Sequence, residues 1–150
     1  MVCQDVEVGS GRCECGGVRY RCVAELRPVV NCHCDRCRRI TGHHMAASGC
    51  ATPDLVFDSD ATLRWYEPTA GIFYGFCGTC GSTLFWRSDT DPAWTSIAAG
   101  TLDQPTGLHT AAVWWTDHAA DYHELDPLLD SYPREPPPGD SPTSPRRPGA

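Results

Sequence analysis

Seven of the ten cysteines fall into three short groups whose spacings suit metal binding. The groups are, in chain order, Cys13-x-Cys15, Cys32-x-Cys34-x-x-Cys37 and Cys77-x-x-Cys80. Spacers of one or two residues let neighbouring thiolates bind the same ion, and zinc prefers such ligands in a tetrahedron. Either pair could instead be a redox dithiol. Because three groups occur in one chain of 150 residues, we favour metal binding over redox chemistry.

The first and last groups can complete each other. Cys77 and Cys80 are followed by Gly81, which permits the sharp turn of a zinc knuckle, and Cys13 and Cys15 precede a second glycine turn. Four thiolates fill a zinc tetrahedron and leave no open position. These cysteines therefore predict a structural zinc site that joins distant parts of the chain.

The middle group is one ligand short. Cys32, Cys34 and Cys37 offer three thiolates, with no further cysteine at a chelating spacing. Three protein ligands and an open position are typical of a catalytic zinc, where water or substrate completes the shell. The alternative is that His43 or His44 closes a structural Cys3His site, whereas His33, between two of the cysteines, is badly placed to bind the same ion. Spacing alone leaves these alternatives open.

The residues around the cysteines resemble the glutathione-dependent formaldehyde-activating enzyme (GFA) and centromere protein V (CENP-V) family. The matching segments are 12–20, 31–42 and 76–84, and the likeness extends over about residues 10–132. The resemblance implies a β-tent fold with two zinc ions per chain. It assigns Cys13, Cys15, Cys77 and Cys80 to the structural zinc, and Cys32, Cys34 and Cys37 to the catalytic zinc.

The resemblance also supplies a reaction. It implies a carbon-sulfur lyase that joins formaldehyde to glutathione, giving S-hydroxymethylglutathione, so that the partners are a small thiol such as glutathione and an aldehyde. One segment departs from the family pattern: His43-His44-Met45 stands where many relatives carry a small residue, proline and an aromatic. These histidines could shuttle protons, close the metal shell or lie in solvent, and another low-molecular-weight thiol could replace glutathione.

Charge and the terminal sequences limit the other partners. The formal net charge of -7 argues against nucleic acid or an anionic membrane held by bulk electrostatics. The first residues have no basic and apolar signal segment, and the longest uncharged stretch, 68–86, is interrupted by glycines, so that we expect neither export nor a membrane span. We therefore expect a cytoplasmic protein with reduced cysteines.

The scaffold is predicted to be mainly β, built of short antiparallel strands with little helix. Val18, Tyr20 and Cys22 alternate with arginines as in a half-buried strand, which makes Cys22 a core residue. One helical turn is expected at 35–40. Further strands are expected at 28–30, 45–51, 55–57, 62–66, 72–76, 83–86, 94–98 and 110–115.

The composition changes near Tyr132. We predict one zinc domain over residues 1–132 and a flexible Pro-rich tail over 133–150, which has no periodic apolar positions. An alternative to catalysis is a zinc-stabilised binding module that uses the acidic surface and the tail. Methionine sulfoxide reduction is a weaker alternative, since Cys3 or Cys50 would be the nucleophile and neither lies in a matching motif.

Overall fold

The computed structural model describes residues 7–137 and is mainly β, as predicted. Cys3 and residues 138–150 of the predicted tail lie outside the described residues. The chain divides into two compact units that alternate along the sequence. Unit 1 consists of residues 7–26 and 48–107, and unit 2 consists of residues 27–47 and 108–137. Within residues 7–137, no helix is both long and apolar enough to cross a membrane.

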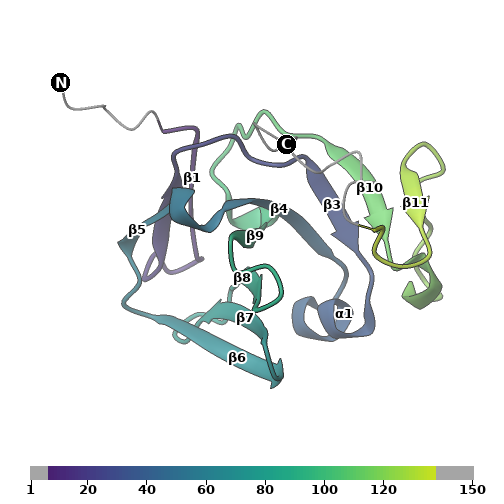
Figure 1. The fold of residues 1–150 in the computed structure, drawn as a ribbon, viewed down its shortest axis with the longest axis horizontal. Coiled ribbons are helices and arrows are strands. Elements are labelled where there is room, and N and C mark those ends of the chain that lie inside the picture. The colour runs from purple at the N-terminus through teal and green to yellow at the C-terminus, as the bar shows by residue number, and fades with distance from the viewer. Residues whose placement is uncertain (1–6, 138–150) are drawn as a thin grey trace. The chain divides into compact units, whose positions relative to one another are not determined.

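Unit 1 contains two sheet segments (Figure 1). One is an antiparallel sheet of β1 (Gly9–Arg12), β2 (Arg19–Cys22) and β5 (Leu55–Ser59). In the other, the end of β4 is followed across the sheet by β9, β8, β7 and β6. The bounds are β4 Met45–Ala51, β6 Leu63–Thr69, β7 Ile72–Cys77, β8 Thr83–Ser88 and β9 Trp94–Ala98, with single 3-10 turns η1 (Thr52–Asp54) and η2 (Ala99–Thr101).

Aromatic and aliphatic side chains fill the core of unit 1. Tyr20 and Phe85 are fully buried and meet edge to face, with ring centroids 5.2 Å apart. The Tyr20 hydroxyl lies 2.7 Å from the hydroxyl of Thr101, which satisfies its polar tip. Cys22 is also fully buried, with its sulfur 3.9 Å from that of Cys50. Its prediction as a core residue is confirmed, and Cys50 is another buried thiol outside the metal-spaced groups.

Gly49 in β4 allows a close approach to the neighbouring strand. A Cβ atom at this position would lie 2.5 Å from the Trp94 ring and 2.7 Å from the Thr95 carbonyl oxygen. We expect Gly49→Ala to lower the free energy of unfolding of the zinc-loaded protein by about 1–3 kcal/mol, because the backbone must shift. Urea denaturation measures this change. Gly100→Ala is the matched control, since no atom lies within 4 Å of its Cβ, and equal stability of both variants would contradict the packing account.

Unit 2 carries the middle cysteine group. Its strands lie in the order β11 (Asp130–Tyr132), β10 (Thr110–Trp114), β3 (Val29–Cys32) and the start of β4, with helix α1 (Asp35–Thr41) between β3 and β4 and the 3-10 turn η3 (Thr116–His118) after β10. β3 and β4 are antiparallel, but β10 pairs in parallel with both β3 and β11. This pairing departs from the antiparallel expectation. Long connections make it possible, because parallel neighbours need a crossover of a dozen or more residues.

Candidate metal centres

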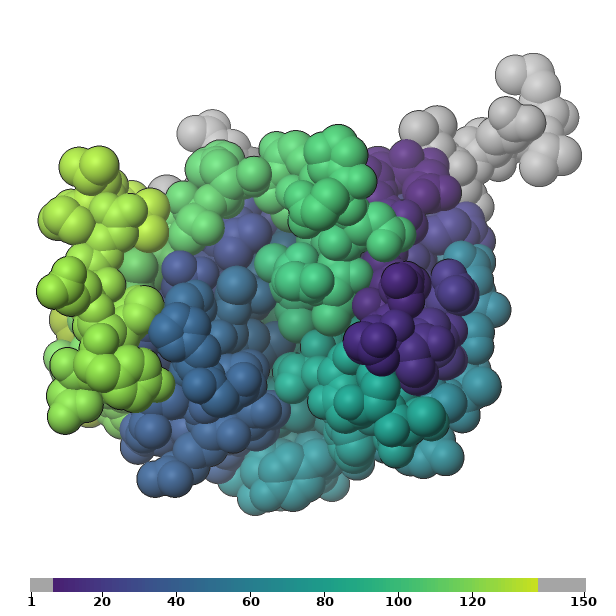
Figure 2. Space-filling view, turned by 180° about the vertical axis from the view of Figure 1, so that it is seen from behind, coloured from purple at the N-terminus to yellow at the C-terminus, as the bar shows by residue number. Residues whose placement is uncertain are grey.

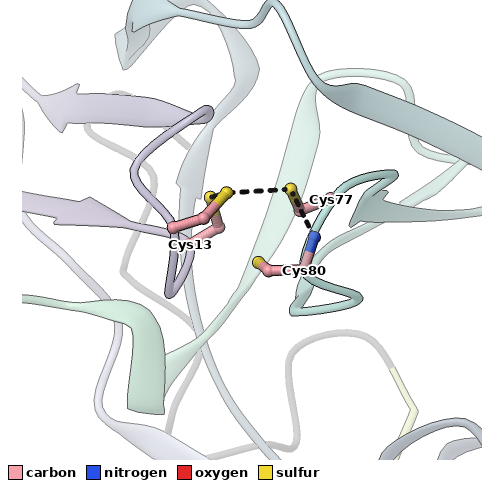
Figure 3. A group of neighbouring side chains, drawn as sticks. Cys13, Cys77 and Cys80 are labelled. Atoms are coloured by element: carbon pink, nitrogen blue, oxygen red, sulfur yellow. Dashed lines mark hydrogen bonds between the residues drawn. The ribbon is translucent and has the colours of Figure 1, made fainter.

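Two turns of unit 1 bring together the first and last cysteine groups. Cys13 and Cys15 lie in the turn between β1 and β2, while Cys77 ends β7 and Cys80 lies in the turn before β8. All four sulfurs lie within 4.8 Å of one another. The sulfur of Cys15 is 3.6 Å from that of Cys13 and 3.7 Å from that of Cys77. Figure 3 shows the sulfurs of the two turns facing one another across a small gap.

The spacing of these sulfurs fits a zinc ion. Tetrahedral zinc has Zn–S bonds of about 2.3 Å, which places its sulfur ligands about 3.8 Å apart. The closest separations in the group come within a few tenths of an ångström of that value. The group as a whole can therefore hold zinc with four protein ligands and no open position.

Hydrogen bonds favour the thiolate form of two of these four cysteines, Cys77 and Cys80. The backbone N–H of Val18 donates to the sulfur of Cys13 at 3.3 Å, and that of Cys80 donates to Cys77 at 3.4 Å. The Thr62 hydroxyl, 3.1 Å from the Cys77 sulfur, is the main cause of the lowered pKa of Cys77. The Ser82 hydroxyl is the main cause that lowers the pKa of Cys80 to about 5. Such donors favour thiolates, which are the forms that bind metal.

Both turns end on a glycine with a left-handed backbone. Gly16 follows Cys15 with φ 79°, and Gly81 follows Cys80 with the same angle. The N–H of Gly81 donates to the Cys77 carbonyl at 2.9 Å, and the N–H of Gly16 donates to that of Cys13 at 3.2 Å. A positive φ is inexpensive only for glycine, so both glycines are required by the turn geometry.

The second cysteine group lies in unit 2, where β3 passes into α1. Cys32 is the last residue of β3, Cys34 is the N-cap of α1 and Cys37 lies in the first turn of the helix. Their three sulfurs lie within 4.8 Å of one another. The sulfur of Cys34 accepts a hydrogen bond from the backbone N–H of Cys37 at 3.3 Å, so the cap that starts the helix also fixes the Cys34 thiol. Gly42, with φ 81°, ends the helix near the predicted position.

Two of the three thiols differ in how readily they lose their protons. Hydrogen bonds from Cys32 and Cys37 are the main causes that hold the pKa of Cys34 well below its usual range. The same contacts raise the pKa of Cys32. Cys34 is therefore favoured over Cys32 as a thiolate, which is the form that binds metal.

A buried arginine lies close to this group. Arg27 stacks over the Trp114 ring at 5.5 Å and donates to the Ala47 carbonyl at 3.0 Å. Burial is the main cause that lowers its pKa to about 10, and Glu135 and Cys32 oppose that shift. The guanidinium thus stays protonated at neutral pH and offsets the negative charge of the thiolates. We did not predict Arg27, because no local motif marks it.

No histidine joins the second cysteine group among residues 7–137. His44 belongs instead to a separate histidine group with His33 and His123, and His43 is exposed beside it. Burial is the main cause that lowers the pKa of His33 and of His44 to about 4. The cysteine group is therefore left with three ligands from the described residues. We did not predict from the sequence that His123 lies beside His33 and His44.

All nine cysteines in the described part of the chain are free thiols. They comprise the seven members of the two groups, together with Cys22 and Cys50 in the core of unit 1. This state is the one that metal binding requires.

A family model and a solved structure are similar to this chain. The family model described as glutathione-dependent formaldehyde-activating enzyme matches residues 8–118, which include both cysteine groups. No curated protein matches the sequence. Among solved structures, the crystal structure of a Rhodobacter sphaeroides protein is similar, with a TM-score of 0.54 and 20% identity over 82% of this chain and 98% of that chain. At this identity, the likeness concerns the fold alone.

Proposed function

The chain belongs to the glutathione-dependent formaldehyde-activating enzyme family, and we propose that it is a zinc enzyme that joins a small thiol to an aldehyde. The reaction we assign is addition of glutathione, or another low-molecular-weight thiol, to formaldehyde to give the S-hydroxymethyl adduct. Its formal class is carbon-sulfur lyase. The observation that supports it most is the group of Cys32, Cys34 and Cys37, which has three sulfurs and no fourth ligand from residues 7–137.

We assign one zinc to each cysteine group. Cys13, Cys15, Cys77 and Cys80 would hold a structural ion, since all four sulfurs lie within 4.8 Å of one another and two of their separations are close to those of tetrahedral zinc. Cys32, Cys34 and Cys37 would hold the catalytic ion with one position open to substrate. Free thiols throughout the described part of the chain fit a reducing compartment, and we place the protein in the cytoplasm.

Zinc bound at the second group supplies a cation that stabilises the thiolate form of a fourth sulfur ligand. Three cysteine thiolates already exceed the charge of a divalent ion, so the site is a weak Lewis acid. We therefore assign it to binding and delivering the substrate thiol, not to polarising the aldehyde. Arg27, which is buried near Cys32, offsets part of the negative charge that a fourth thiolate adds.

The proposed reaction is balanced without a further reagent. The substrate sulfur forms a bond to the formaldehyde carbon, and the carbon-oxygen double bond becomes a single bond. The proton that the thiol gives up ends on the new hydroxyl oxygen. No oxidant or reductant is consumed.

The rate of adduct formation tests the proposal. Zinc-loaded protein is mixed with formaldehyde and either glutathione or another small thiol, and the S-hydroxymethyl product is followed by NMR against the reaction without protein. We expect clear acceleration with one thiol over the others. If zinc is bound but the protein does not accelerate the reaction of any thiol with formaldehyde, the enzyme proposal is wrong. A zinc-stabilised binding module is then the better account.

A further inference from the structure

A third group of metal-binding side chains lies in unit 2, separate from the cysteines. It consists of His33 after β3, His44 before β4, and His123 in the segment between η3 and β11. One nitrogen of each lies within 4.8 Å of the others. The ring centroid of His33 is 4.8 Å from that of His44 and 4.8 Å from that of His123. Figure 2 shows the yellow-green segment that contains residue 123 packed against the blue segment of unit 2.

Two nitrogens of this group are buried without a hydrogen-bond partner. His33 is only 2% exposed, and its Nε2 has no hydrogen-bond partner in the described part of the chain. Nδ1 of His44 is buried and unpartnered as well. A buried polar atom with no partner costs about 1–3 kcal/mol, and such atoms are rare in folded proteins. Two of them in one cluster indicate a ligand that uses their lone pairs.

We propose that His33, His44 and His123 bind a divalent transition-metal cation of the zinc class. Imidazole nitrogens suit zinc and its neighbours in the first transition row, and three of them with one open position form a known type of zinc site. A tetrahedral ion with Zn–N bonds of about 2.1 Å places its nitrogens about 3.4 Å apart. The nitrogens already lie within 4.8 Å of one another, so each separation has to shorten by at most about 1.4 Å to reach that value.

This ion differs from the one proposed for Cys32, Cys34 and Cys37. Three neutral imidazoles leave the full double positive charge on the metal, whereas three thiolates more than cancel it. The histidine site is therefore the stronger Lewis acid, and its open position suits water, hydroxide or a carbonyl oxygen. The proposal goes beyond the proposed function and does not depend on it.

Metal counting tests the histidine site. Wild type, His123→Gln and His44→Gln are equilibrated with the same buffered free zinc, and bound zinc is measured by mass spectrometry. We expect both variants to hold one zinc ion fewer than wild type. His118→Gln and His43→Gln are matched controls, because both are histidines of unit 2 outside the group, and both should keep the wild-type content.

Circular dichroism of each variant establishes that it is folded before zinc is counted. If one histidine variant does not fold, the other carries the comparison. If neither folds, anomalous diffraction at the zinc edge from wild-type crystals grown with zinc decides. A peak about 2.1 Å from the nitrogens of His33, His44 and His123 supports the proposal. Wild-type zinc content in the folded variants, or no peak at this position, overturns it.

Discussion

Cys77→Ser is expected to abolish stable folding of unit 1 and to release its zinc. Cys77 is fully buried at the end of β7, and its sulfur lies 3.7 Å from that of Cys15 on a turn distant in sequence. Structural zinc contributes about 10–16 kcal/mol in small zinc domains, which is comparable to the whole folding stability of about 5–15 kcal/mol of a typical protein. Far-UV circular dichroism and zinc content measure both effects.

A matched control separates the zinc from the loss of a buried thiol. Cys22 is equally buried in unit 1 but belongs to no metal-spaced group, so Cys22→Ser removes a core thiol without touching a ligand. This substitution should lower the free energy of unfolding by only about 1–3 kcal/mol and leave the zinc content unchanged. A Cys77→Ser protein that melts as the Cys22→Ser protein does, with wild-type zinc, would disprove the structural site.

Cys34→Ser is expected to remove the second zinc and the activity while the protein remains folded. A serine hydroxyl is a poor zinc ligand at neutral pH, so the remaining two thiols bind the ion weakly. Serine is nevertheless a good N-cap and can still accept from the N–H of Cys37, so helix α1 keeps its start. The rate of adduct formation should fall by about 100-fold or more. Substitution of residues that only hydrogen-bond to metal ligands already lowers metal affinity or activity by up to about that factor.

Three measurements on the same Cys34→Ser sample test this prediction. Zinc content should fall by one ion, the circular dichroism spectrum should match wild type, and the catalysed rate of adduct formation should fall by about 100-fold or more. Cys22→Ser again serves as control and should retain zinc and activity. Global unfolding of Cys34→Ser would make the cluster structural, and unchanged zinc content would remove it from the metal sites.

Local patterns made the strands and the cysteine groups predictable. Strand 45–51 and strand 94–98 were predicted with the bounds that the structure has, because apolar runs between turn residues mark them clearly. β1 (Gly9–Arg12) was missed, since its glycines and polar residues give no alternation. β11 (Asp130–Tyr132) was missed as well, because it is short and depends on pairing with β10 across a long connection.

The parts of the site that were missed are those created by long-range packing. His123 is brought to His33 only by the return of the C-terminal segment of unit 2, and nothing near it in sequence indicates a ligand. Arg27 reads as an ordinary charged residue before a proline, but the fold buries it beside the thiols. The cysteines were predictable because chelation acts over two or three residues, whereas these contacts depend on strand pairing.

The open position at Cys32, Cys34 and Cys37 is the central claim, and a crystal structure of zinc-loaded protein with glutathione tests it most directly. The account predicts zinc bound by these three sulfurs, with the glutathione sulfur as fourth ligand about 2.3 Å from the metal. A nitrogen of His43 or His44 in that position, with glutathione absent, would contradict the account and make the site structural.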